Sequence, residues 1–214
     1  MPRGLIYFAD PMCSWCWGFS NVIEKIKDDF SAQLPIRVMM GGLYAGATKP
    51  LDPAGKEAMR EHWQHVAELT GAEFNHDFFE RESFVYDTEP ACRAVVIVCQ
   101  HAPASMLAFL KQIQAAFYTQ NRDITDRTVL FEEAEKFGFN PKTFAGQFDD
   151  ENIIAETRTH FSVTRQVEVR AFPTLFAVDD AGQETITSGY QPWEKMHARI
   201  NAWLNESINR ASDA

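Results

Sequence analysis

Leu5-Ile6-Tyr7-Phe8-Ala9-Asp10-Pro11-Met12-Cys13-Ser14-Trp15-Cys16 is a short apolar run followed by a closely spaced pair of cysteines. An uninterrupted apolar run of this length is typical of a buried parallel strand, and Asp10-Pro11 indicates where that strand ends. From Phe19 to Phe30 the apolar side chains recur at helical spacing. The cysteine pair is therefore predicted to lie where a strand gives way to the N-terminus of a helix.

Outward from this stretch, strand patterns and helix patterns are segregated along the chain. Three further strands are predicted, at residues 36–40, 175–178 and 184–187, the last two joined by a hairpin turn. Residues from about Leu51 to Val167 read almost wholly as helices, and a final helix is predicted from Pro192. The order β-α-β, helical block, β-β-α lets the two outer parts form one sheet with the helical block inserted between them.

Composition narrows the class of protein. The 214 residues are 45% hydrophobic and carry a formal net charge of -10. An acidic chain is repelled by phosphate backbones, so we expect no nucleic acid partner. No apolar stretch is long enough to span a bilayer and no signal peptide is recognisable, so we expect no membrane association and a cytoplasmic location.

The spacing of Cys13 and Cys16 suits disulfide exchange. That chemistry needs a thiolate that attacks and a second thiol close enough to resolve the mixed disulfide. At a helix N-terminus, Cys13 would meet unpaired backbone N–H groups and the positive end of the helix dipole, which favour its thiolate. Cys16 would lie one turn further in as the resolving thiol. We therefore predict Cys13 and Cys16 as the catalytic residues.

A cysteine pair of this spacing is also half of many zinc sites. The other two cysteines, Cys92 and Cys99, are seven residues apart on a predicted helix, roughly 10 Å along its axis. They are poorly placed to share an ion or to form a disulfide with each other, and are interpreted as small buried apolar groups. We predict no metal site.

Ala171-Phe172-Pro173-Thr174 precedes the strand at 175–178 and is the second element of the predicted site. Proline is tolerated at the first position of a strand. A cis Phe172–Pro173 bond would turn the Phe172 backbone toward the cysteines, where it could pair with an extended substrate. Trans bonds are far commoner in general, and the pairing with the cysteine motif is what favours cis here.

Residues 7–19 resemble the active-site segment of the DsbA-like thioredoxin family and, more narrowly, of its FrnE-like cytoplasmic branch of disulfide isomerases. Phe172-Pro173-Thr174 matches the cis-proline loop of that family. The resemblance implies an α/β protein of thioredoxin-like fold with a large all-helical insertion. Residues 1–48 and 166–214 would then be the two parts of the thioredoxin-like domain, and residues 49–165 the inserted helical domain.

Around the cysteines we predict four substrate-binding residues, which are Ser14, Trp15, Phe172 and Pro173. Trp15 is expected to be exposed. The partners expected are protein thiols and disulfides together with an electron donor or acceptor. No cofactor is expected beyond the redox-active disulfide itself, with glutathione as a candidate redox partner. Because Ser14-Trp15 places no histidine between the cysteines, strongly oxidising behaviour is not expected. The Asp10 carboxylate would destabilise the Cys13 thiolate if it turned inward.

Other residues leave alternatives open. Trp17 and Phe19 fit either a peptide-docking surface or the core. His62 and His65 are three apart on a predicted helix and are interpreted as solvated or capping rather than metal-binding. Glu24 could accept a proton from Cys16, but a solvated position on the helix surface is the safer interpretation.

The sequence supports four functions to different degrees. The leading hypothesis is a protein thiol–disulfide oxidoreductase or isomerase. The alternative is a glutathione-dependent transferase or isomerase of the kappa and hydroxychromene-carboxylate isomerase type, in which a serine activates glutathione. A redox sensor or holdase and a structural zinc module are the remaining hypotheses.

Overall fold

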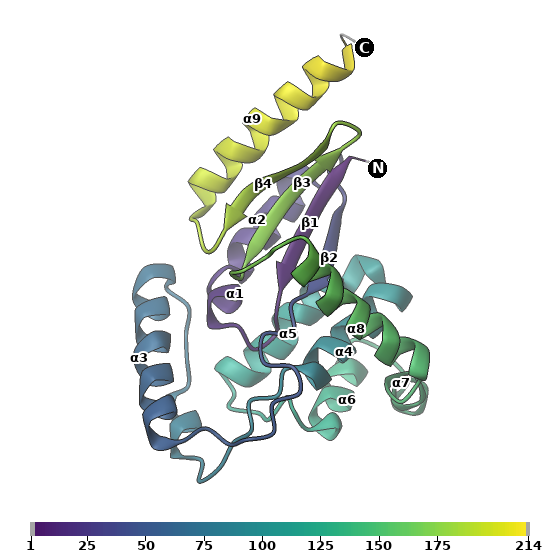
Figure 1. Ribbon diagram of the computed structural model, residues 1–214. Coiled ribbons are helices and arrows are strands. Elements are labelled where there is room, and N and C mark those ends of the chain that lie inside the picture. The colour runs from purple at the N-terminus through teal and green to yellow at the C-terminus, as the bar shows by residue number, and fades with distance from the viewer. Residues whose placement is uncertain (1–2, 213–214) are drawn as a thin grey trace.

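The computed structural model describes residues 3–212 and places a single mixed sheet at the centre of the chain (Figure 1). The strand order is β2-β1-β3-β4. The strands are β1 (Gly4–Ala9), β2 (Ile36–Met40), β3 (Thr174–Asp179) and β4 (Gly182–Ser188). The N-terminal and C-terminal parts of the chain thus meet in one sheet, as the order of predicted elements allowed.

Strand β1 is an inner strand with a different partner on each side. It pairs in parallel with β2, and antiparallel with β3, where Tyr7 lies opposite Leu175. The prediction of a buried parallel strand is therefore correct on the β2 side alone. Inner strands are buried on both faces, which explains the uninterrupted apolar run.

Nine α-helices lie within residues 3–212, together with short 3₁₀ helices at His76–Glu80 and Pro103–Ser105. The α-helices are α1 (Ser14–Gly18), α2 (Ser20–Phe30), α3 (Pro53–Thr70), α4 (Glu89–His101), α5 (Met106–Tyr118), α6 (Arg127–Lys136), α7 (Pro141–Phe148), α8 (Glu151–Gln166) and α9 (Trp193–Ser212). Helices α3 to α8 fill the stretch between β2 and β3, which confirms the fold class. The exact domain boundaries at residues 48 and 165 stay a prediction.

The helices form layers around the sheet. Helix α9 contacts α2 and also β3 and β4, whereas α8 and α4 contact β2 (Figure 1). Helix α3 stands beside α1 at the end of the sheet where β1 finishes. Helix α1, which carries Cys16 and follows Cys13, thus contacts two inserted helices, α3 and α5.

The helix that follows the cysteine motif is interrupted. A single helix was expected to contain the motif and run to Phe30, but the structure ends α1 at Gly18 and starts α2 at Ser20. Phe19, at the junction, is fully buried and its ring lies 5.9 Å from that of Tyr7. The interruption lets Phe19 pack on the sheet while α1 faces the insertion.

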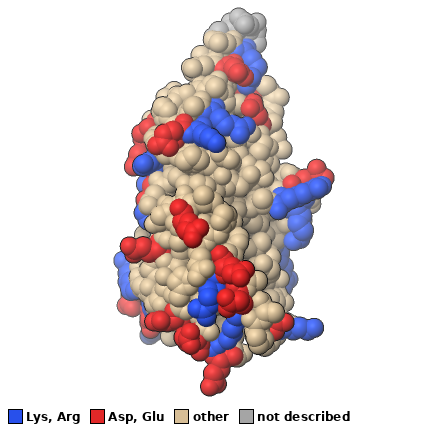
Figure 2. All heavy atoms as spheres, turned by 90° about the vertical axis from the view of Figure 1, so that its left-hand side faces the viewer, with Lys and Arg blue, Asp and Glu red and all other residues tan. Residues whose placement is uncertain are grey.

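Charged side chains are dispersed over the face shown in Figure 2, where acidic and basic groups alternate between broad uncharged areas. On this face no continuous basic surface is visible. Within residues 3–212, no helix combines the length and the apolar character that crossing a membrane requires.

Candidate active site

Cys13 lies at the junction between β1 and α1. It is the N-cap residue of α1, and its backbone is extended with φ -91° and ψ 114°. The turn before it is closed by a hydrogen bond of 3.1 Å from the Cys13 N–H to the Asp10 carbonyl. The Trp17 N–H donates to the Cys13 carbonyl at 3.0 Å and starts the helix. The predicted position at a helix N-terminus is confirmed.

Cys16 lies one turn into α1 and is completely buried, whereas Cys13 keeps 6% of its surface exposed. Burial raises the pKa of the Cys16 thiol well above its usual range, and the hydrogen bond with Cys13 raises it further. A protonated, buried thiol next to a slightly exposed one is the asymmetry that an attacking and a resolving cysteine require.

The loop before β3 closes the site from the opposite side. The Phe172–Pro173 peptide bond is cis. The Cys13 thiol donates to the Phe172 carbonyl oxygen with an Sγ to O distance of 3.8 Å. Pro173 is buried, and its carbonyl accepts a hydrogen bond from the Gly189 N–H at 2.7 Å. The structure therefore brings Cys13, Phe172 and Pro173 together across 160 residues of sequence.

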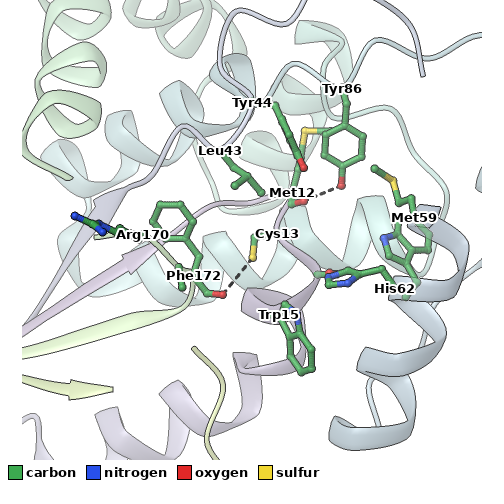
Figure 3. Close-up of a pocket in the computed structure, with 13 residues that line it drawn as sticks. Met12, Cys13, Trp15, Leu43, Tyr44, Met59, His62, Tyr86, Arg170 and Phe172 are labelled. Atoms are coloured by element: carbon green, nitrogen blue, oxygen red, sulfur yellow. Dashed lines mark hydrogen bonds between the residues drawn. The ribbon is translucent and has the colours of Figure 1, made fainter. Parts of the chain in front are cut away.

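A cavity of about 300 Å³ opens beside Cys13 (Figure 3). Its lining comes from α1 and the turn before it, from α3, from the loop after β2, from the segment before α4 and from the loop before β3. The lining residues are Met12, Cys13, Ser14, Trp15, Leu43, Tyr44, Met59, His62, Trp63, Tyr86, Arg170, Ala171 and Phe172. A second cavity of about 460 Å³ shares Tyr44, Met59, His62 and Tyr86 with the first, so the hollow extends away from the sulfur toward Lys49.

The two residues between the cysteines differ in exposure. Ser14 is buried in the wall of the cavity. Trp15 was expected to be exposed but is half-buried. Rings from α3 and from the loop after β4 flank it. The rings of His62 and His65 meet it edge-on at 5.8 and 5.7 Å, and Tyr190 lies 6.0 Å away.

His62 and His65 were interpreted from the sequence as solvated or capping. The structure instead places both against Trp15 at the edge of the site. Burial lowers the pKa of His62, and the neighbouring His65 lowers it further. No sequence pattern links α3 to α1, so this contact could not be predicted. Among residues 3–212, no cluster of three or more potential metal ligands occurs.

Phe19 is completely buried, whereas Trp17 is half-buried and packs against the insertion. The Trp17 ring stacks on Tyr118 of α5, and its indole N–H donates to the Glu73 carbonyl at 2.9 Å. Glu24 is ion-paired with Lys111 at 2.5 Å on the surface, so the solvated interpretation holds. These contacts fix α1 and α2 against the insertion and leave Cys13 facing the cavity.

Sequence reasoning did not assign Tyr86 and Leu43 to the site. The Tyr86 hydroxyl donates to the Met12 carbonyl at 2.7 Å, directly before Cys13. Leu43 and Tyr44 are 39% and 51% exposed and form one wall of the cavity (Figure 3). The apolar pair Leu43-Tyr44 directly after Gly41-Gly42 was the available signal in the sequence for this wall.

All four cysteines are free thiols in the structure. Cys92 is buried and Cys99 half-buried. Burial raises the pKa of Cys99 to about 12, so this thiol stays protonated at neutral pH.

The chain resembles known proteins along most of its length. A family model described as thioredoxin matches residues 7–197. The structure of a putative protein disulfide isomerase from Nitrosomonas europaea has a TM-score of 0.90 and 34% sequence identity, over 96% of this chain and 99% of that one. The cytosolic disulfide reductase DsbM from Pseudomonas aeruginosa gives a TM-score of 0.77 and 26% identity, over 94% of this chain and 98% of that one. DsbM has also been solved with GSH.

A curated relative is the ClpXP adapter protein SpxH of Bacillus subtilis, 22% identical over 175 residues, which are 81% of this chain and 58% of SpxH. The chain spans about three fifths of the length of the curated relatives it matches. The FrnE-like branch is not distinguished by these matches and stays a prediction. The family model covers most of the chain, and the relative from Nitrosomonas europaea is 34% identical over nearly all of it, so the chain belongs to the thioredoxin family.

Proposed function

We propose that this protein is a thiol–disulfide oxidoreductase or isomerase that exchanges disulfides with protein substrates through Cys13 and Cys16. The observation that carries the proposal is the asymmetry of the pair. Cys13 lies at a helix N-terminus beside a cavity, whereas Cys16 is buried behind it. The putative protein disulfide isomerase and the cytosolic disulfide reductase among the similar structures support the same chemistry.

In the proposed reaction the Cys13 thiolate attacks one sulfur of a substrate disulfide. A bond forms between Cys13 and that sulfur, and the other substrate sulfur leaves as a thiolate that takes up a proton. Cys16 then loses its proton and attacks the Cys13 sulfur, which releases the second substrate thiol and leaves a Cys13–Cys16 disulfide. Two electrons and two protons have passed to the substrate, and the reverse sequence oxidises it.

Phe172 and Pro173 would present their backbone to the substrate beside the cysteines, with Ser14 and Trp15 on the other side. The Phe172 carbonyl already accepts a hydrogen bond from the Cys13 thiol, so it lies within reach of a chain bound to Cys13. The cavity past Leu43 and Tyr44 offers apolar surface for a side chain near the substrate cysteine.

Glutathione is the proposed redox partner and the cytoplasm the proposed location. The cytosolic reductase DsbM, solved with GSH, supports both.

Two single substitutions test the roles of the cysteines. Cys13→Ser should reduce insulin-disulfide reduction to background, because the attacking thiolate is lost. Cys16→Ser should accumulate a mixed disulfide on Cys13, detected by intact mass, because the resolving step is lost. Cys99→Ser is the matched control and should retain activity. Full activity in Cys13→Ser would refute the proposal.

The alternative function, a glutathione-dependent transferase, can be distinguished from the oxidoreductase by its reaction product. It predicts conjugation of glutathione to a chlorinated aromatic compound, with no reduction of insulin disulfides. Conjugation by the unmutated protein while insulin stays oxidised would favour the transferase over the oxidoreductase.

A protein-binding role without turnover is favoured by one observation, the similarity to SpxH adapter proteins. It predicts that the double variant Cys13→Ser/Cys16→Ser still binds a reduced, unfolded client with unchanged affinity. If the double variant no longer bound the client, binding would depend on disulfide exchange, and the hypothesis of a protein-binding role without turnover would be wrong.

A further inference from the structure

Tyr86 reaches the cysteine motif from the helical insertion, between the 3₁₀ helix at His76–Glu80 and α4. Its side chain is buried, with 5% of its surface exposed. Its hydroxyl donates a hydrogen bond of 2.7 Å to the carbonyl of Met12, 74 positions earlier in the chain (Figure 3). Tyr86 therefore joins the insertion to the residue directly before Cys13.

The bonded carbonyl belongs to the peptide group between Met12 and Cys13. The other end of that group is bonded too, because the Cys13 N–H donates to the Asp10 carbonyl at 3.1 Å. The Met12 N–H donates to the Asp10 carboxylate at 2.9 Å. A peptide group is planar and nearly rigid, so bonds at both of its ends fix its orientation. The turn after β1 holds one end, and the insertion holds the other.

The place of the Cys13 sulfur follows from this backbone. Cys13 is the N-cap of α1, and its carbonyl accepts a hydrogen bond from the Trp17 N–H at 3.0 Å. The Cys13 thiol donates to the Phe172 carbonyl oxygen, with 3.8 Å between Sγ and O. A thiol is a weak donor, so this contact alone does not hold the sulfur in place. The orientation of the Met12–Cys13 peptide group therefore decides where the sulfur meets the cavity.

The ring of Tyr86 is held by its neighbours. The rings of Phe84 and Phe117 meet it edge to face at 5.8 and 5.7 Å, and the ring of Tyr44 meets it at 5.6 Å. A side chain packed by several rings keeps its hydroxyl directed at one acceptor. Burial also raises the pKa of Tyr86 well above its usual range, so the hydroxyl retains the proton that it donates.

A second buried hydroxyl lies next to the first but does not reach the motif. The oxygens of Tyr118 and Tyr86 are 3.5 Å apart. The Tyr118 ring stacks on Trp17, and within residues 3–212 its hydroxyl has no hydrogen bond to residues 10–16. The two tyrosines thus share one environment and differ in the bond to Met12.

We propose that Tyr86 is a positioning residue for the nucleophile, whose hydroxyl holds the Met12–Cys13 peptide group so that the Cys13 sulfur is presented to the cavity as a reactive thiolate. This inference rests on the proposed function, because it concerns the attacking step of the same exchange reaction. It assigns to the insertion a part in that step, in addition to its part in the cavity wall.

The hydroxyl acts in two ways that have the same sign. It fixes the orientation of the peptide group, and it offsets part of the negative charge on the Met12 carbonyl oxygen. A carbonyl without a donor next to the nucleophile would oppose the formation of negative charge on sulfur. Loss of the hydroxyl therefore leaves less thiolate at neutral pH and a less well-placed sulfur, and both slow the attack.

The test measures alkylation of Cys13 by iodoacetamide in a Cys16→Ser background, followed on the Cys13 peptide by mass spectrometry. The thiolate displaces iodide and a carbon–sulfur bond forms, so the rate reports the attacking sulfur alone. Tyr86→Phe keeps the ring and removes the hydroxyl. Its rate at pH 7 should fall about threefold to tenfold, the size of one lost hydrogen bond, and the midpoint of its pH profile should move to higher pH. An unchanged rate and pH profile in folded Tyr86→Phe would overturn the inference.

Tyr118→Phe in the same background is the matched control. It removes the neighbouring buried hydroxyl and leaves the bond from Tyr86 to Met12, so its rate and its pH profile should stay unchanged. Equal slowing in both variants would mean that any lost hydroxyl in this part of the core has the same effect, and the inference would be wrong. Failure of the proposed function appears separately, as insulin reduction that persists in Cys13→Ser.

A variant with the opposite expected sign decides the matter if Tyr86→Phe does not fold. Replacement of Tyr86 by 3-fluorotyrosine retains the ring and the hydroxyl, and the fluorine makes the hydroxyl a stronger donor. Alkylation of Cys13 should then become faster at pH 7, and the midpoint of its pH profile should move to lower pH. A rate that stayed the same or fell would overturn the inference.

Discussion

Gly41 leaves room for the ring of Phe172 at the candidate active site. A Cβ built on Gly41 would lie 2.2 Å from the Phe172 ring, and one on Gly42 would lie 2.6 Å from the ring of Phe161. Gly42 also adopts a φ of +63°, a conformation that favours glycine. Because the Phe172 carbonyl faces the Cys13 thiol, Gly41 affects how closely the loop before β3 approaches Cys13.

Gly41→Ala should therefore displace Phe172 and weaken the site. We expect a loss of about 1–3 kcal/mol in the free energy of unfolding, since overpacking forces neighbouring groups to shift. Disulfide reduction should fall more than stability alone explains. Urea denaturation and an insulin assay measure the two effects. Gly146→Ala is the matched control, because nothing lies within 4 Å of a Cβ there. Equal activity in both variants would contradict this account of Gly41.

At the residue scale, the sequence predicted where the motif lies better than what surrounds it. The structure confirms the place of Cys13 at a helix N-terminus and the cis bond before Pro173, whereas the catalytic roles of Cys13 and Cys16 stay a prediction. The contacts of Asp10 with Leu43 and Cys92 join residues that are 33 and 82 positions apart. Such pairings depend on how the insertion packs on the sheet, and no local pattern encodes them.

At the element scale, α8 is anchored to the end of β2 by two side chains. The Nδ1 of His160 accepts a hydrogen bond from the Met40 N–H at 3.3 Å, and the Thr164 hydroxyl donates to the Met40 carbonyl at 3.2 Å. The first bond requires a neutral imidazole nitrogen. Burial lowers the pKa of His160, and Glu156, 3.6 Å from its Nε2, opposes that effect in part.

This anchor predicts a pH dependence of stability. Because the pKa of His160 is lower in the folded state, the unfolded chain takes up a proton first as the pH falls. The contribution of His160 to stability is complete above about pH 6.5, the unfolded value, and decreases as the pH falls through the folded value. His160→Gln should flatten the decrease between pH 7 and pH 5 in urea denaturation. An unchanged slope would contradict the assignment.

Most elements could be predicted individually, but their arrangement could not. The four strands and the helical block were recognised because apolar periodicity is a local signal. The break at Phe19 was missed, since the apolar pattern continues through it and the buried ring decides the geometry. The antiparallel pairing of β1 with β3, and the contact of α3 with Trp15, arise from long-range packing.

At the scale of the whole molecule, sheet and insertion share one hydrophobic core. Tyr7 and Ile23 from the thioredoxin-like part belong to the same buried cluster as Trp63, Val96 and Phe117 from the insertion. Cys13 and Cys16 are members of that cluster too. The insertion therefore forms part of the wall of the candidate site beside Cys13.

The pairing of Cys13 with Cys16 as the redox couple is the central claim, and disulfide mapping tests it most directly. The unmutated protein is equilibrated in glutathione buffers from reducing to oxidising, its free thiols are alkylated, and its peptides are identified by mass spectrometry. The account predicts one reversible disulfide, between Cys13 and Cys16, with Cys92 and Cys99 remaining thiols throughout. A disulfide that included Cys92 or Cys99, or a Cys13–Cys16 pair that stayed reduced across all the buffers, would contradict it.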